Sequence, residues 1–115
     1  MTDERMIQLF NLQADICKTL ADPTRLMILY ELKKGETSVG QLTAILGLPQ
    51  SNVSRHLAVL RERALVTTRR DGTTIYYCLA NPKIAKACDI VREVLESQLM
   101  HSQSLVNSLD LLKKP

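Results

Sequence analysis

Aromatic residues are scarce in this chain, whose 115 residues include three Tyr, one Phe and no Trp. Proteins that bind single-stranded nucleic acid without sequence preference stack the bases on aromatic side chains, so this composition argues against such a platform. Long apolar runs are missing as well, because no segment approaches the roughly 20 apolar residues of a membrane-spanning helix. No leader-like segment precedes the first apolar pattern. We expect a cytoplasmic protein with no membrane partner.

Cysteine and histidine are also few, with three of the former and two of the latter. An odd cysteine count without a CxxC pair argues against a secreted disulfide framework and against a zinc ribbon. None of the thiols stands in the sequence setting of an activated catalytic cysteine, and neither a phosphate loop nor a nucleophile elbow occurs. We therefore expect that the protein is not an enzyme.

The charge of the chain is nearly balanced, at +3 with a pI near 8.9. Its distribution is uneven. The arginines of the middle of the chain are Arg55, Arg61, Arg63, Arg69 and Arg70, and they follow the acidic residues Asp3, Glu4, Asp15 and Asp22. A local positive surface on a nearly neutral protein favours selective, salt-dependent binding to nucleic acid over indiscriminate binding.

Two short amphipathic helices are predicted between residues 37 and 64. The apolar residues at helical spacing are Val39, Leu42 and Ile45 after the candidate caps Thr37 and Ser38, and Val53, Leu57 and Leu60 after Ser51. Between the two sets, Gly47 can adopt the left-handed conformation that ends a helix, and Pro49 lacks the N–H of a continuing helix. The pattern predicts a helix-turn-helix whose second helix, residues 51–64, enters the DNA major groove.

The start of this second helix presents polar side chains on its outer side. They are Gln50, Ser51, Asn52, Ser54 and Arg55. Short hydrogen-bonding groups and one arginine can meet phosphates and base edges without filling the groove. A helical hairpin with an ordinary polar face is the alternative for this segment. A winged helix that binds protein is another, but its exposed positions should be apolar or acidic. For His56 the alternatives are a phosphate contact and packing between helices.

Two strand-forming runs follow, residues 65–70 and 73–79, with Asp71-Gly72 between them as a hairpin signal. A two-residue turn there pairs Thr68 with Ile75 and Val66 with Tyr77. Period two then places Val66, Thr68, Ile75, Tyr77 and Leu79 toward the helices, and Thr67, Arg69, Thr74, Tyr76 and Cys78 on the other face.

The predicted tip of this hairpin carries cations and hydroxyls that suit contact with phosphate or the minor groove: Arg69, Arg70, Thr73 and Thr74. Protection of an edge strand by charge is the alternative for the two arginines. A helix-turn-helix followed by such a hairpin is a winged helix. We therefore predict a mainly α protein with a β-hairpin, of the α+β class.

Apolar residues also line a predicted helix at each end of the chain, about residues 3–21 and 82–110. The two sets are Met6, Phe10, Ile16, Cys17 and Leu20, and Ile84, Cys88, Val91, Leu95 and Leu99. Two apolar terminal helices in so short a chain favour a dimer interface, and closure of the monomer's own core is the alternative. We predict one winged helix-turn-helix domain, residues 1–115, that forms a homodimer through these helices.

Over roughly residues 14–80 the chain resembles the ArsR/SmtB family of small dimeric bacterial repressors. The matching segments are Leu20-Ala21-Asp22-Pro23-Thr24-Arg25-Leu26-Met27-Ile28-Leu29, Ser38-Val39-Gly40-Gln41-Leu42, Gln50-Ser51-Asn52-Val53-Ser54-Arg55-His56-Leu57, Leu60-Arg61 and the wing from Arg69 to Tyr77. The resemblance implies a homodimer that binds an inverted-repeat operator on the bacterial nucleoid and releases it when an inducer binds. The first and last helices would place the recognition helices about one DNA turn apart, roughly 34 Å.

The metal sites of that family are not intact in this chain. The resemblance implies thiolates in the first helix of the helix-turn-helix, where the chain has Ser38-Val39-Gly40-Gln41, or an Asp/His set in the last helix. In that last helix the chain offers Asn81, Lys83, Asp89 and His101, which do not have the ligand spacing of zinc. We expect no required cofactor and none of the usual metal sites.

Cys17 and Cys88 are the candidate sensor residues, one in each terminal helix. If these helices pack as the resemblance implies, the thiols could form a disulfide or polysulfide bridge, or hold As(III) or another thiophilic ion. The family's persulfide sensors carry a cysteine late in the second helix, where this chain has Ile28-Leu29-Tyr30. Cys78 is a weaker candidate. Packing as small buried hydrophobes is the alternative, and a regulator without any ligand stays open.

Overall fold

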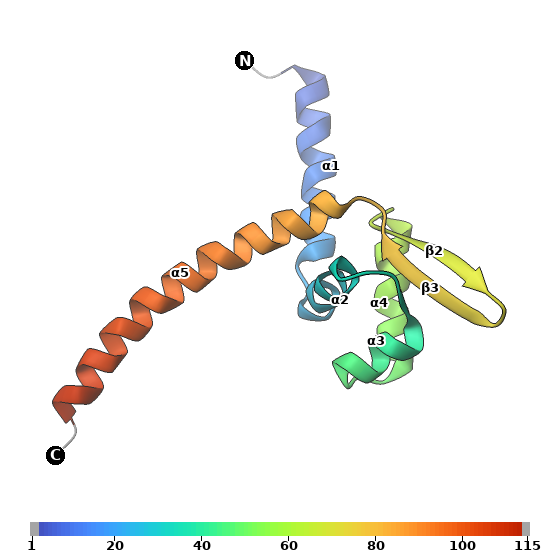
Figure 1. The fold of residues 1–115 in the computed structure, drawn as a ribbon. Helices are drawn as coiled ribbons and strands as arrows, with labels where there is room; N and C mark the ends of the chain where they lie inside the picture. The colour runs from blue at the N-terminus through green and yellow to red at the C-terminus, as the bar shows by residue number, and fades with distance from the viewer. Residues whose placement is uncertain (1–2, 114–115) are drawn as a thin grey trace. The chain divides into compact units, whose positions relative to one another are not determined.

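The computed structural model describes residues 3–113, and these fall into two compact units (Figure 1). The first unit ends at Ala85 and the second begins at Lys86. In chain order the elements are α1 (Glu4–Leu20), α2 (Pro23–Lys33), β1 (Thr37–Ser38), α3 (Val39–Leu46), α4 (Gln50–Glu62), β2 (Val66–Asp71), β3 (Thr74–Leu79) and α5 (Pro82–Lys113). The predicted class, mainly helical with a small antiparallel hairpin, is confirmed.

The boundaries of the first three helices follow from local hydrogen bonding. The Asp3 and Asp22 carboxylates accept from the backbone N–H groups of Met6 and Arg25, at 2.9 and 3.1 Å, and cap α1 and α2. Ser38 forms a capping box with Gln41 at the start of α3. Gly47 ends α3 in the left-handed conformation, with φ 65°. The predicted cap at Ser38 and the stop at Gly47 are confirmed.

The recognition helix α4 was predicted with the wrong ends. It begins at Gln50, after Pro49, whose carbonyl accepts from the N–H groups of Asn52 and Val53. Ser51 therefore lies inside the first turn and does not precede the helix. The helix ends at Glu62 because the chain then turns, and Ala64 adopts a left-handed conformation with φ 58°.

The sheet contains one strand that was not predicted. The structure pairs β1 with β3, Thr37 opposite Tyr77 and Ser38 opposite Tyr76, so the order is β1-β3-β2. Two residues are too few to show an alternating pattern, so the sequence indicates only helix caps at Thr37 and Ser38.

The register of the β2–β3 hairpin differs from the predicted one by two residues. Asp71 pairs with Thr74, so Gly72 and Thr73 form the turn, and Thr68 faces Tyr77. Gly72 has φ 63° whereas Asp71 is not in the left-handed region, which is the Gly-X form of a two-residue turn. A slip of two residues preserves the faces of each strand. The predicted pairs are therefore wrong, and the predicted faces are confirmed.

The core of the first unit joins α2 to the helix-turn-helix and the hairpin. Its buried members are Ile28, Leu29, Leu32, Leu42, Val53, Leu57, Leu60, Leu65 and Val66. Around them pack partly buried side chains that include Ile16, Leu20, Tyr77, Leu79 and Ile84. The predicted apolar face of α4 is buried throughout. In α3 only Leu42 is fully buried, and Ile45, predicted on the same face, is 55% exposed.

The second unit is the continuation of α5, a helix with apolar side chains exposed along it. These include Ile90, Val91, Val94, Leu95, Leu99, Met100, Leu105, Val106 and Leu109. Arg92 forms ion pairs with Asp89 and Glu96 of the same helix. Within residues 3–113, no helix combines the length and apolar character that crossing a membrane requires.

Candidate nucleic-acid interface

The first two turns of α4 present a polar surface to solvent. Val53, Leu57 and Leu60 face the core with no exposed area. At 3.6 residues per turn, the remaining positions point outward: Gln50, Ser51, Ser54 and Arg55 are exposed, and Asn52 is half-buried. All five residues predicted to contact DNA from this helix thus lie on its solvent side.

Two of these side chains are already joined. The Arg55 Nη2 donates to the Asn52 Oδ1 at 3.0 Å, one turn earlier on the helix. This bond limits the rotamers of a long side chain, and so reduces the entropy that Arg55 loses on binding. The guanidinium N–H groups that are not bonded to Asn52 are donors suited to the two acceptors of a guanine edge.

The N-terminus of α4 favours an anion. Its first turn has no side-chain cap and no acidic residue, in contrast to α1 and α2, which begin with aspartate caps. The first N–H groups of a helix carry the positive end of its dipole. A phosphate can therefore be bound where α1 and α2 use their own carboxylates.

His56 packs against the start of α2. Its Nδ1 lies 3.8 Å from the Asp22 Oδ1, and its side chain is 12% exposed. Burial alone raises the pKa of Asp22, but the backbone N–H of Arg25 and the charges of His56 and Arg25 bring that pKa below its ordinary value. Of the two roles considered for His56, the structure favours packing between helices over a phosphate contact.

Of the four wing residues predicted to contact DNA, Arg69 forms an ion pair within the chain. The other three are exposed. Arg69 forms a bidentate pair with Glu36, with Nη2 2.7 Å from Oε1 and Nε 3.0 Å from Oε2. Its guanidinium also lies over the Tyr76 ring, 4.8 Å from the centroid. Because of the hydrogen bonds from Arg69, the pKa of Glu36 is lowered. No sequence pattern indicates this pair.

Arg70, Thr73 and Thr74 are exposed at the tip of the hairpin. Within the described residues, Arg70 forms no ion pair or hydrogen bond through its side chain. It alternates with Arg69 across the strand, so the two guanidinium groups leave opposite faces of the ribbon. Arg70 is therefore the wing cation with no competing partner in the described part of the chain.

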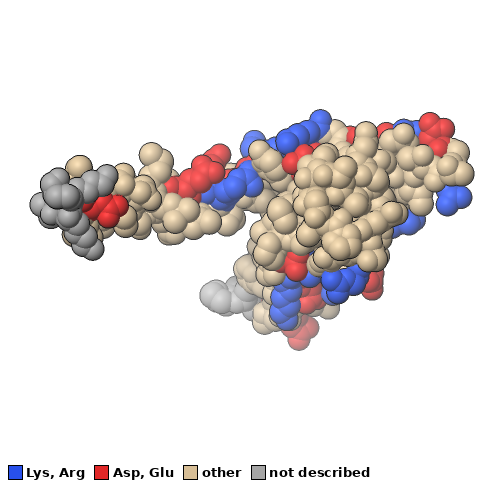
Figure 2. Space-filling view, turned by 90° about the horizontal axis from the view of Figure 1, so that it is seen from below, with Lys and Arg blue, Asp and Glu red and all other residues tan. Residues whose placement is uncertain are grey.

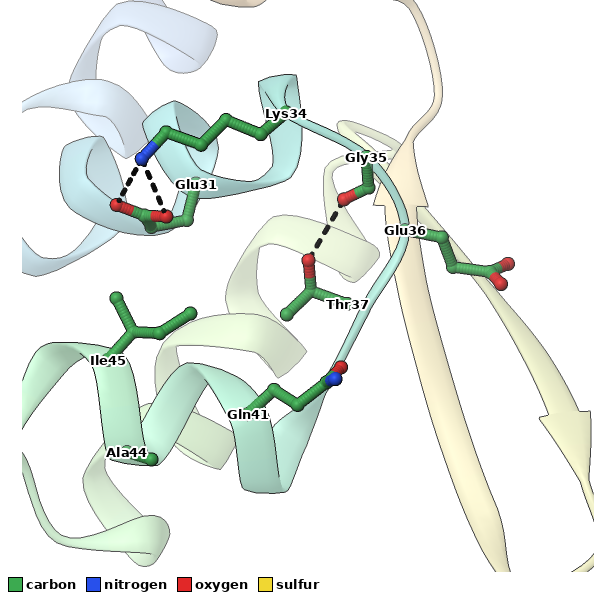
Figure 3. A pocket seen from close by; sticks show the side chains of 8 residues that line it. All are labelled: Glu31, Lys34, Gly35, Glu36, Thr37, Gln41, Ala44 and Ile45. Carbon is green, nitrogen blue, oxygen red and sulfur yellow. Dashed lines mark hydrogen bonds and ion pairs between the residues drawn. The ribbon is translucent and has the colours of Figure 1, made fainter.

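An open hollow of about 410 Å³ lies beside the turn that carries Glu36 (Figure 3). It is lined by Glu31, Lys34, Gly35, Glu36, Thr37, Gln41, Ala44 and Ile45. The Lys34 Nζ lies 3.1 and 3.2 Å from the two Glu31 carboxylate oxygens. Figure 3 shows the Glu36 carboxylate directed away from this pair, toward the strands.

The candidate sensor residues lie in different units. Cys17 is exposed in the first unit, and Cys88 is half-buried in the second. Cys78 is half-buried in β3, where its Sγ lies 3.0 Å from the Thr67 Oγ1 of β2. Among the described residues, no three His, Cys, Asp or Glu side chains converge as a metal site would require. The sensing role of Cys17 and Cys88 stays a prediction.

Charge on the surface is mixed. On the face in Figure 2, acidic and basic side chains are interspersed over the described residues, and no continuous basic area covers it. The geometry of α4 and the wing defines a winged helix-turn-helix, the class of fold that places one helix in the major groove.

Comparison with known proteins gives the family. Residues 22–68 match the profile described as "Bacterial regulatory protein, arsR family". The uncharacterized HTH-type transcriptional regulator Rv0081 of Mycobacterium tuberculosis is 39% identical over 102 residues, which cover 88% of this chain and 90% of that protein. The biofilm growth-associated repressor of Xylella fastidiosa is 39% identical over 98 residues, 85% of this chain and 86% of its own.

Comparison with solved structures supports the same family. The crystal structure of Rv0081 has a TM-score of 0.73 at 41% identity, over 82% of this chain and 95% of that one. The solution structure of Mb0332 from Mycobacterium bovis, described as a homodimeric winged helix-turn-helix DNA-binding domain, has a TM-score of 0.77 at 32% identity, over 87% and 93%. The chain belongs to the ArsR family of bacterial regulatory proteins. It is a DNA-binding transcriptional regulator, a role that is not enzymatic.

Proposed function

We propose that this chain is a homodimeric repressor that binds an inverted-repeat operator and releases it when an inducer binds. The observation that carries the proposal is the solvent face of α4, where five polar side chains surround an uncapped helix N-terminus. In this reading α4 contacts base edges in the major groove, and the wing contacts the backbone or minor groove. The relative from Xylella fastidiosa is itself named a repressor. A protein with this function acts in the bacterial cytoplasm.

Dimer formation is supported by exposed apolar side chains on both terminal helices. On α1 these are Met6, Ile7, Leu9, Phe10 and Leu12, each between 41% and 62% exposed. On α5 they include Leu95 and Leu99, exposed by 50% and 58%. Exposed apolar patches on soluble proteins mark interaction sites. We assign α1 and α5 to the interface between two copies of the chain, as the homodimeric Mb0332 relative suggests.

DNA binding is tested by fluorescence anisotropy of the reduced, full chain with a duplex from its own upstream region. A shuffled duplex of the same composition serves as the control. The proposal predicts binding to the upstream duplex that is at least about 1,000-fold tighter than to the control, the range typical of specific recognition. Equal affinities would contradict sequence-specific repression, and no binding to either duplex would favour a winged helix that binds protein.

For the inducer we propose a thiol-directed agent that acts at Cys17 and Cys88: reactive sulfur, an oxidant or As(III). Cys17 is exposed in α1, and Cys88 is half-buried in α5. A bridge between the terminal helices would alter the spacing of the two recognition helices. A regulator that responds to no ligand is the competing function.

The thiol assignment is tested by repeating the anisotropy measurement after a sulfane-sulfur donor, diamide, As(III) and Zn(II). The proposal predicts release by a thiol-directed agent. Cys17→Ser and Cys88→Ser should each abolish that release without changing operator affinity, whereas Cys78→Ser, the matched control, should still respond. A double Cys17→Ser, Cys88→Ser variant that responds normally would rule out the two-thiol sensor.

A further inference from the structure

The pair between Arg69 and Glu36 spans the sheet of the wing. Glu36 lies just before β1 and Arg69 lies in β2, and β3 runs between those strands. Arg69 reaches across β3 over the ring of Tyr76, which is paired with Ser38 of β1 on one side and with Arg69 on the other. One side chain thus connects the outer strand of the hairpin to the turn that follows α2.

The contact between Arg69 and Glu36 limits the movement of the β2–β3 hairpin, which forms the wing. A two-stranded hairpin has little stability of its own, and β1 adds only Thr37 and Ser38 to it. The guanidinium is held by three short contacts to one carboxylate, at 2.7, 3.0 and 3.3 Å. A planar bidentate pair combined with stacking on an aromatic ring fixes orientation in a way that a single point charge does not.

The same contact determines where Arg70 points. Adjacent residues of a strand leave opposite faces, so an Arg69 held toward Glu36 directs Arg70 to the other face of the ribbon. Arg70 is exposed there without an ion-pair partner among the described residues. We propose that Arg69 is a positioning residue that holds the wing through Glu36, and that Arg70 is the wing cation that binds a DNA phosphate.

This inference rests on the proposed DNA binding and revises the prediction that both arginines contact DNA. It has a clear competitor, in which Arg69 leaves Glu36 and binds a phosphate of its own. The two cases differ in what Glu36 does: it supports binding in the first and masks a cation in the second.

The test compares Arg69→Gln, Arg70→Gln, the double variant and Glu36→Gln by anisotropy over a salt series. Each lost phosphate contact lowers the slope of log K against log salt by about one unit and costs up to about tenfold at 0.1 M salt. Glu31→Gln is the matched control for the charge change, because it removes another paired carboxylate from the lining of the same hollow.

If Arg69 positions the wing, Arg69→Gln and Glu36→Gln each weaken binding, and Glu36→Gln binds less tightly than the Glu31→Gln control. Arg70→Gln lowers the slope by about one unit, and adding Arg69→Gln to it changes neither affinity nor slope. Far-UV circular dichroism and thermal unfolding are measured for each variant, and a binding loss without a folding loss supports the proposal.

The inference is overturned if the double variant loses about two slope units, or if Glu36→Gln binds more tightly than Glu31→Gln. Either result makes Arg69 a phosphate ligand in its own right. Failure of the proposed function has a different signature, since the unmodified chain would then not bind its upstream duplex and both proposals would fall together.

Discussion

At the scale of single residues, we expect Arg55 to contact a base. It is exposed on the second turn of α4 and is held by Asn52 at 3.0 Å. Arg63 offers a contrast, because it is an exposed arginine at the C-terminal end of the same helix. Position on the helix, and not charge alone, should therefore decide which arginine matters for sequence recognition.

Arg55→Ala should cost about 1 to 3 kcal/mol of operator binding and relax base preference at one position of each half-site. Arg63→Ala, the control, should change affinity for the operator and for a shuffled duplex by the same small factor. The measurement is competition anisotropy with single-base operator variants. A loss for Arg55→Ala that is equal on all duplexes would show that Arg55 contacts phosphate and does not read a base.

Asp22 links stability to pH. Its pKa is lowered in the folded chain, because the Arg25 N–H and the charges of His56 and Arg25 outweigh the opposing effect of burial. A depressed folded pKa gives stability that is present above the unfolded value, near 3.8, and is lost as pH falls through the folded pKa. Asn can cap α2 as well as Asp but does not titrate.

Asp22→Asn should therefore be less stable than the unmodified chain at pH 6 and equally stable below the folded pKa of Asp22. Urea unfolding at fixed protein concentration, repeated between pH 6 and pH 2.5, measures the difference. A gap between the two proteins that stays constant over this range would show that the carboxylate charge contributes nothing and that only the cap matters.

At the scale of elements, the turn of the wing depends on one glycine. Gly72 has φ 63°, and a Cβ added there would meet nothing within 4 Å. The cost of a side chain is therefore a backbone cost, about 1 to 2 kcal/mol for a non-glycine residue in this region. Gly40 is the opposite case, because it lies inside α3 and its added Cβ would meet only the Ser38 Oγ at 3.9 Å.

Substitution of glycine by alanine should thus have opposite effects on the free energy of unfolding at the two sites. Gly72→Ala should lower the free energy of unfolding by about 1 to 2 kcal/mol, and Gly40→Ala should raise it by up to about 1 kcal/mol. Chemical denaturation of both variants measures this. Stabilisation by Gly72→Ala would contradict the turn assigned to Gly72 and Thr73.

Elements that depend on local pattern were predictable from the sequence. The stop at Gly47 and the buried spacing of Val53, Leu57 and Leu60 needed only neighbouring residues, and so did the outward position of Arg55. The hairpin register was not predictable, because Asp71-Gly72 and Gly72-Thr73 are both acceptable two-residue turns. The pair of Arg69 with Glu36 joins residues 33 positions apart, and no sequence pattern indicates it.

At the scale of the whole molecule, binding to both halves of an operator requires a dimer. Phe10 of α1 is 54% exposed and Ile45 of α3 is 55% exposed. The first lies on a helix assigned to the dimer interface, and the second lines the open hollow. Neither supports the core of its unit, so a charge at either position should leave the fold intact.

Phe10→Asp should convert a dimer of twice 12.9 kDa to a monomer, and it should weaken operator binding because only one recognition helix is then held to the DNA. Ile45→Asp should remain dimeric. Sedimentation velocity and circular dichroism measure both variants. A dimeric Phe10→Asp would show that α1 is not part of the interface, and a monomeric Ile45→Asp would place the interface on the hollow.

Two copies of α4 should read the two halves of one operator. A hydroxyl-radical footprint of the reduced protein on its own upstream DNA is the decisive test. This arrangement of α4 predicts two protected segments in adjacent major grooves, related by a two-fold axis and about 10 base pairs apart from centre to centre, with weaker flanking protection from the wings. Uniform protection along the duplex, or one unsymmetrical segment, would contradict it.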